Sequence, residues 1–213
     1  MTKYRSAPAG EPASEVREVI QPFPPLIAPL SAVRSTLIQA SLAELKKHGY
    51  YDHYTKLIAP ASLEQLLSLA IAPCWIPVQL ALDHYDACER MQLNEAQFAQ
   101  LGLSVGDRVQ DVTLIAPKHE PSGGRDLWQS IGALHRMWPR LFQGGGVQVV
   151  KVGAKALVLE ERGFQLNRFH YYRQAHVAAV RATHSALGAQ LTSVRLISYQ
   201  AARDEMIVRV EWQ

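Results

Sequence analysis

The fold class follows from a stretch near the C-terminus, where residues 205–212 read EMIVRVEW. Apolar side chains occupy every second position of this stretch, which is the period of a β-strand with one buried face. Residues 147–152, 155–162 and 192–199 show the same period and are separated by short turns or by a helix. The four segments predict an antiparallel sheet.

A long helix is predicted between the two pairs of strands, over residues 168–187, and it ends at Gly188. The C-terminal third of the chain is therefore predicted to be β-β-α-β-β, an antiparallel sheet crossed by one long helix. Upstream, residues 31–143 follow the helical period. The fold class is predicted to be α+β, with an N-terminal helical part followed by the sheet.

Within the helical part, residues 32–48 predict the first helix and residues 125–143 the last. Two further helices are expected to meet near Gly102, which is predicted to end the first of them. Gly144-Gly145-Gly146 follows a predicted helix and precedes a predicted strand, whereas a phosphate-binding loop needs the opposite order. These glycines therefore predict a tight redirection of the chain.

The chain is expected to form one domain with a tail. Residues 1–30 are rich in proline and predict a largely disordered tail, whose second half is apolar enough to lie extended on the domain or on a partner. Residues 31–213 predict a single α+β domain, with residues 31–143 as the helical part and residues 144–213 as the sheet part.

Composition excludes several classes of function. The 213 residues are 48% hydrophobic and 19% charged, with a net charge of +3, as in an ordinary globular domain. Basic residues are scattered, so we expect no binding to nucleic acid. No stretch is apolar enough for membrane insertion, and no targeting signal precedes the domain. Two cysteines predict reduced thiols, which fits a reducing compartment, so we expect a cytoplasmic protein.

Motifs for catalysis or metal binding are missing. The eight histidines lack the local spacing of metal ligands, and the serines lack a Gly-x-Ser-x-Gly elbow. We therefore expect no catalytic residue, no metal and no cofactor. Aromatic residues with a polar end are typical of the wall of a core or a cavity, and both interpretations stay open. A ligand pocket between the helical part and the sheet would be lined by Trp75, Tyr85, Trp138, Phe142, Phe169, Tyr172 and His176.

Three stretches resemble a known family. Residues 74–77 (CWIP) lead into residues 83–88 (DHYDAC), residues 138–146 read WPRLFQGGG, and residues 208–212 read VRVEW. Together they resemble a family of uncharacterised proteins of similar length that is abundant in myxobacteria. The resemblance covers residues 31–213, and its motifs imply a fold rather than an activity.

The predicted order of elements is also similar to a broader group of ligand-binding domains. This group contains the heme-dependent nitric-oxide sensors, the vinyl-reductase-like domains and the vesicle-tethering subunits with an acyl-binding cavity. The similarity is one of architecture. The Tyr-x-Ser-x-Arg motif that the heme sensors use for the heme propionates is missing here, as is the cysteine cluster of the vinyl-reductase-like domains. Both absences count against the corresponding cofactor.

Our main hypothesis is a non-enzymatic binding or regulatory module that takes a small apolar ligand or a protein partner. A sheet with one open face also makes a homodimer an expectation. One alternative is a sensor that holds heme or another cofactor, with His135, His170 or His176 as the ligand. Others are an enzyme with an acidic residue and a histidine in a cleft, and a scaffold without a ligand pocket.

Overall fold

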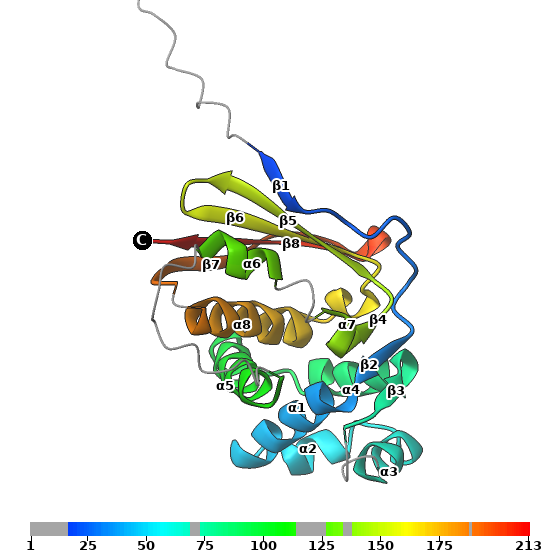
Figure 1. Ribbon diagram of the computed structural model, residues 1–213. Coiled ribbons are helices and arrows are strands. Elements are labelled where there is room, and N and C mark those ends of the chain that lie inside the picture. The colour runs from blue at the N-terminus through cyan, green and yellow to red at the C-terminus, as the bar shows by residue number, and fades with distance from the viewer. Residues whose placement is uncertain (1–16, 69–72, 114–126, 134–137, 188) are drawn as a thin grey trace, which may run out of the picture.

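The computed structural model describes residues 17–68, 73–113, 127–133, 138–187 and 189–213 (Figure 1). Helices pack against antiparallel sheets, which confirms the α+β class. The helices are α1 (Ser35–Lys47), α2 (Tyr51–Thr55), α3 (Pro60–Ser68), α4 (Val78–Arg90), α5 (Glu95–Thr113), α6 (Leu127–Ala133), α7 (Trp138–Leu141) and α8 (His170–Ala186), with the short 3-10 helices η3 (Gln165–Arg168) and η4 (Ala201–Arg203).

The larger sheet has five strands in the order β1-β5-β6-β8-β7, and each neighbouring pair is antiparallel. Four of its strands match the four predicted segments. The fifth, β1, was not predicted, because four residues within a proline-rich segment show no clear period; it pairs with β5 through Glu18 and Lys151. The strands are β1 (Glu18–Gln21), β5 (Gly146–Gly153), β6 (Ala156–Arg162), β7 (Leu191–Gln200) and β8 (Glu205–Trp212).

Three short strands form a smaller sheet, and two of them lie where the ends of helices were predicted. Its order is β3-β2-β4, and β2 (Ala32–Arg34) lies between β3 (Trp75–Pro77) and β4 (Phe142–Gln143). Residues 32–34 and 142–143 were predicted to be helical. Strands of two or three residues are too short to show a period of two, and the pairing brings together segments far apart in the chain.

Helix α5 runs through Gly102, so the prediction that a helix ends there was wrong. A Cβ atom on Gly102 would lie 2.9 Å from the carbonyl carbon of Gln174 in α8. The missing side chain allows the backbones of α5 and α8 to approach closely where the helices cross.

The predicted redirection at the three glycines is present. Gly144 and Gly145 have φ angles of +88° and +69°, which favour glycine. A Cβ atom on Gly144 would collide with the carbonyl of Pro29, because residues of the N-terminal segment lie across this turn. The backbone N–H of Gly145 donates a hydrogen bond of 2.7 Å to the carbonyl of Ala28.

Helix α8 lies between the sheet and the helical part of the molecule (Figure 1). One apolar core fills the space among α1, α4, α5 and the start of α8, and a second lies between the sheet and the rest of α8. Two faces of α8 are therefore buried against these cores, whereas Arg181 and Ser185 of the same helix are exposed. None of the described helices has the length and apolar character needed to cross a membrane.

Candidate functional site

Two neighbouring tyrosines of α8 point to different surroundings. Consecutive residues of an α-helix are about 100° apart around its axis, so Tyr171 and Tyr172 face different neighbours. The hydroxyl of Tyr171 reaches Ser41 of α1, whereas the ring of Tyr172 contacts the ring of His176, one turn further along α8. Each tyrosine belongs to a separate buried polar cluster.

The first cluster, which we call the closed network, consists of Ser41, Tyr54, His84 and Tyr171. The Nδ1 atom of His84 lies 2.8 Å from the hydroxyl of Tyr54. Its Nε2 atom lies 2.9 Å from Oγ of Ser41, which in turn lies 2.7 Å from the hydroxyl of Tyr171. Both nitrogens of the imidazole and all three hydroxyl groups therefore have hydrogen-bond partners.

The closed network is neutral at pH 7. Burial lowers the pKa of His84 to about 3, because the charged imidazolium would lose its hydration. Burial also raises the pKa values of Tyr54 and Tyr171. The thiol of Cys88 lies 3.6 Å from Nε2 of His84. Burial raises the pKa of this thiol well above its usual value, which disfavours a nucleophilic thiolate. These features indicate a structural role.

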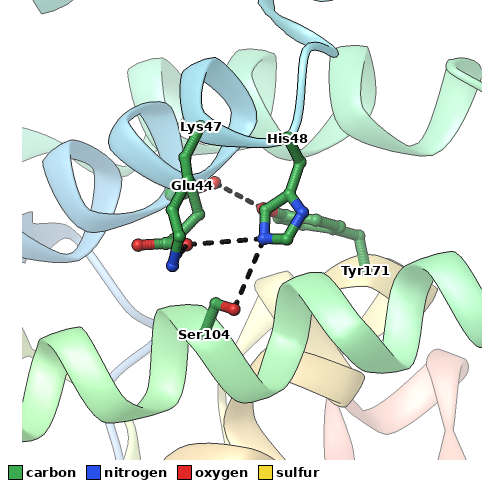
Figure 2. A network of polar contacts seen from close by, with 6 residues as sticks. Glu44, Lys47, His48, Ser104 and Tyr171 are labelled. Atoms are coloured by element: carbon green, nitrogen blue, oxygen red, sulfur yellow. Dashed lines mark hydrogen bonds and ion pairs between the residues drawn. The ribbon is translucent and has the colours of Figure 1, made fainter.

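A histidine, a serine and a glutamate meet between α1 and α5, but they do not form a proton relay. Ser104 and Glu44 both contact the same nitrogen of His48, Nε2, at 3.5 Å and 3.6 Å (Figure 2). A relay requires the acid and the hydroxyl on opposite nitrogens of the ring. Lys47 also contacts the buried Glu44 carboxylate at 3.2 Å. The contact is best explained as support for the packing of α1 on α5.

The second cluster, which we call the open cluster, consists of Trp138, Glu161, Asn167, Tyr172 and His176. Oε1 of Glu161 lies 2.7 Å from Nε2 of His176, and Oε2 lies 3.5 Å from the amide nitrogen of Asn167. The ring centroids of Trp138 and Tyr172 lie 6.0 Å and 5.8 Å from that of His176. The cluster joins α7, β6, η3 and α8.

Buried polar atoms without an aligned hydrogen-bond partner gather in the open cluster. Five of the eight such side-chain atoms in the described part of the chain belong to it. Native proteins leave few buried polar groups unpaired, so a concentration of them at one place needs an explanation. The five atoms are Trp138 Nε1, Glu161 Oε1, Asn167 Oδ1, the Tyr172 hydroxyl and His176 Nε2.

The Glu161 carboxylate dominates the electrostatics of the open cluster. Its side chain is 0% exposed, and that of His176 is 7% exposed. Burial, and next the nearby charge of Glu161, raise the pKa of Tyr172. The Arg173 guanidinium contacts the backbone carbonyl of Asn167 at 2.8 Å and lies over the ring of Tyr199. The Arg173 guanidinium is therefore held by a backbone carbonyl and an aromatic ring rather than by the Glu161 carboxylate.

The residues proposed from sequence as a pocket wall fall largely into one row. Ring contacts connect Phe169 to Tyr85, Tyr85 to Tyr172, Tyr172 to His176, His176 to Trp138, and Trp138 to Phe142. Trp75 instead lies on β3, where the Arg34 guanidinium stacks on its ring at 5.2 Å. Among the described residues, no ring contact joins Trp75 to the row. The role of the row as a pocket wall stays a prediction.

Sequence reasoning missed Glu161 and Asn167. Glu161 follows Leu157 and Leu159 at two-residue steps in β6, and all three side chains are buried. A charged residue in phase with the buried face of a strand was therefore a usable signal. Asn167 lies in a 3-10 helix that carries no period, and nothing in the sequence indicates its contact with Glu161.

The histidines of the described residues do not gather into a metal site. No group of three or more histidine, cysteine, aspartate or glutamate side chains in the described ranges has the geometry to hold a metal ion. Of the three proposed heme ligands, His170 has its Nε2 atom 3.0 Å from the Gln174 amide and 3.4 Å from Glu95. His176 faces Glu161, and His135 lies outside the described residues. The Nε2 atoms of the two described candidates therefore already lie in polar contacts within the protein.

Comparisons with solved structures place the fold among the H-NOX proteins. An unliganded Fe(II) H-NOX mutant from K. algicida aligns with a TM-score of 0.58 and 9% identity, over 84% of this chain and 96% of that one. A Cs H-NOX mutant aligns with a TM-score of 0.54 and 13% identity over 84% and 96%. An H-NOX mutant from T. tengcongensis gives 0.51 and 11% over 83% and 95%.

At these identities the comparisons show a shared fold, which agrees with the distant architectural similarity to heme-NO-binding domains inferred from the sequence. No family model matches the chain, and no curated protein matches it. The class is therefore defined by architecture: an α+β protein with the H-NOX fold.

Proposed function

We propose that this chain is a ligand-binding sensor module, with its ligand held at the open cluster between α8 and the sheet. The observation that carries the proposal is the gathering, around Glu161 and His176, of buried polar atoms that lack an aligned hydrogen-bond partner. A small molecule with matching donors and acceptors would satisfy these atoms, and α8 would transmit its presence to the helical part.

The comparisons support a sensor more than a partner-binding module or a scaffold, because the aligned structures are H-NOX proteins and one is described for its heme distortion. The geometry modifies our original hypothesis of an apolar ligand. Aromatic rings line the open cluster, but its unpaired atoms are polar, so the ligand would be a planar molecule with hydrogen-bonding groups.

Native mass spectrometry of the chain purified from its source tests this proposal. We expect a mass excess that corresponds to one small molecule per chain. Trp138→Phe and Tyr172→Phe each remove a hydrogen-bonding group of the open cluster and should reduce the excess. Tyr171→Phe removes the hydroxyl of the adjacent tyrosine, which belongs to the closed network, and should retain it. A wild-type protein at its bare chain mass would overturn the proposal.

Heme is the second candidate ligand, and the H-NOX fold is the observation that favours it. The buried Glu161 carboxylate and the polar contacts that the Nε2 atoms of His170 and His176 make with protein side chains do not fit it. His135 is the remaining candidate for an iron ligand. A Soret band in the absorption spectrum that His135→Ala removes would establish heme binding, and a colourless protein would exclude it.

The cytoplasmic location and the homodimer remain predictions. The native mass spectrum that detects the ligand also reports the number of chains in the particle, so a mass of twice the chain would support the homodimer. The same spectrum would detect a stably bound protein partner.

A further inference from the structure

Three atoms of the open cluster have no polar contact among the described residues: the Trp138 indole N–H donates, Asn167 Oδ1 accepts, and the Tyr172 hydroxyl can do either. The carboxylate of Glu161 accepts hydrogen bonds and cannot donate one while ionised. Because the amide nitrogen of Asn167 donates to Glu161, its Oδ1 atom points elsewhere and has no partner among the described residues. The indole N–H of Trp138 is the one group that can act as a donor alone. A matching ligand must therefore present at least one donor and one acceptor, and a further donor could bind the remaining lone pairs of the Glu161 carboxylate.

The charge of the cluster disfavours an anion. A second negative charge next to the fully buried Glu161 carboxylate would be strongly repelled at the low effective dielectric constant of the interior. His176 Nε2 lies 2.7 Å from this carboxylate, and the Arg173 guanidinium is held by backbone carbonyls of η3. A cation or a neutral N–H donor would instead gain a charge-assisted hydrogen bond.

The rings around Glu161 select a planar shape. Trp138 and Tyr172 both lie within ring-contact distance of His176, and the faces of such rings attract flat cations. We infer that the ligand of the open cluster is a planar compound with an N–C–N donor edge, such as an amidine, a guanidine or an amino-substituted heterocycle, and that carboxylates and phosphates are rejected. This inference rests on the proposed ligand-binding function.

Two probes of nearly equal shape and opposite charge test this inference. Benzamidine carries a cationic N–C–N donor edge, and benzoate carries an anionic acceptor edge on the same ring. We expect benzamidine at millimolar concentration to bind the full chain saturably and to raise its Tm, and benzoate to do neither. Glu161→Gln should weaken benzamidine binding at least 10-fold, since it removes the charge and converts an acceptor into a donor.

Further variants keep the test informative if Glu161→Gln does not fold. Tyr172→Phe retains the ring and should weaken benzamidine binding by a few-fold. Tyr171→Phe is the matched control and should bind benzamidine as the wild type does. Circular dichroism of each variant checks that the fold is intact. Equal weakening by both tyrosine variants would place the probe elsewhere and overturn the inference.

The outcomes separate this inference from the proposed function. Binding of benzoate as well as benzamidine, or binding of neither, overturns the inference about ligand chemistry. In that case, a native mass excess that Trp138→Phe and Tyr172→Phe reduce would leave the ligand-binding function standing. The wild type could instead show no mass excess and still bind benzamidine through Glu161. That result would support the inferred ligand chemistry of the site and overturn the proposal that the protein carries a natural ligand.

Discussion

The two polar clusters of this protein are built from similar side chains but differ in how well those side chains are paired. The closed network joins two tyrosines, a histidine and a serine, and each of their polar side-chain atoms has a partner at 2.7–2.9 Å. The open cluster combines a tryptophan, a tyrosine, a histidine, a glutamate and an asparagine, and five of its atoms lack an aligned partner.

This difference shows that hydrogen bonding, rather than residue type, separates a structural core from a candidate site. Burial is similar in both clusters, since His84 is 0% and His176 is 8% exposed. In the closed network, substitution should reduce stability, because satisfied groups lose their partners. In the open cluster, loss of a hydroxyl should reduce ligand binding and leave stability nearly unchanged, because the hydroxyl has no partner to lose.

The largest expected effect is the removal of the imidazole from the closed network. His84→Ala should lower the free energy of unfolding by about 3–5 kcal/mol, because it creates a cavity and leaves the hydroxyl of Tyr54 buried without a partner. The urea unfolding midpoint measures this loss. The control is His53→Ala on the exposed surface of α2, which should cost less than about 1 kcal/mol. Similar losses in both variants would contradict a special role for His84.

The next effect is a loss of stability in acid that arises from the closed network. The pKa of His84 is about 3 in the folded state and 6.5 in a model compound, so the unfolded chain takes up a proton first as the pH falls. The stabilisation is complete above about pH 6.5 and declines toward pH 3. Between pH 7 and pH 5 the free energy of unfolding should fall by about 2 kcal/mol through this group.

Urea unfolding of the wild type and two variants at both pH values isolates this contribution. His84→Gln cannot titrate, so its loss between pH 7 and pH 5 should be smaller by about 2 kcal/mol. His53→Gln should keep the wild-type difference. Burial also lowers the pKa of His184. Every variant should therefore still lose some stability between pH 7 and pH 5 through His184. An unchanged pH dependence in His84→Gln would show that another group is responsible.

Much of the sheet could be predicted from the sequence, because long strands repeat their period. Strands β5 to β8 and helix α8 follow periods of two and 3.6 over seven or more residues each. The short strands β1 to β4 have two to four residues and depend on partners elsewhere in the chain. Gly102 misled the prediction because a glycine that ends a helix and one that allows two helices to cross look the same in sequence.

The candidate site was predictable only in part, for a similar reason. Tyr172, Trp138 and His176 were proposed from the abundance of polar aromatic residues, and the structure brings their rings together. The sequence does not reveal which polar atoms lack partners. The hydrogen bond between Ser41 and His84 joins residues 43 positions apart, so local patterns carry no trace of it.

The smallest and most discriminating prediction compares the two adjacent tyrosines of α8. Tyr171→Phe should lower the free energy of unfolding by about 1 kcal/mol, because Ser41 loses one of its two partners in the closed network. Tyr172→Phe should leave it within about 0.5 kcal/mol of the wild type, or raise it, because a buried hydroxyl without a partner is removed.

Urea unfolding of ligand-free protein measures both variants against the same reference. The two substitutions delete the same atom from neighbouring residues of one helix, so helix propensity and lost volume nearly cancel in the comparison. Equal losses would mean that the Tyr172 hydroxyl has a stabilising partner in solution, such as a bound water, and would remove the distinction between the closed network and the open cluster. A loss confined to Tyr171→Phe would confirm that the hydroxyl of Tyr171 stabilises the fold and that the hydroxyl of Tyr172, on another face of α8, lacks a hydrogen-bond partner in the ligand-free protein.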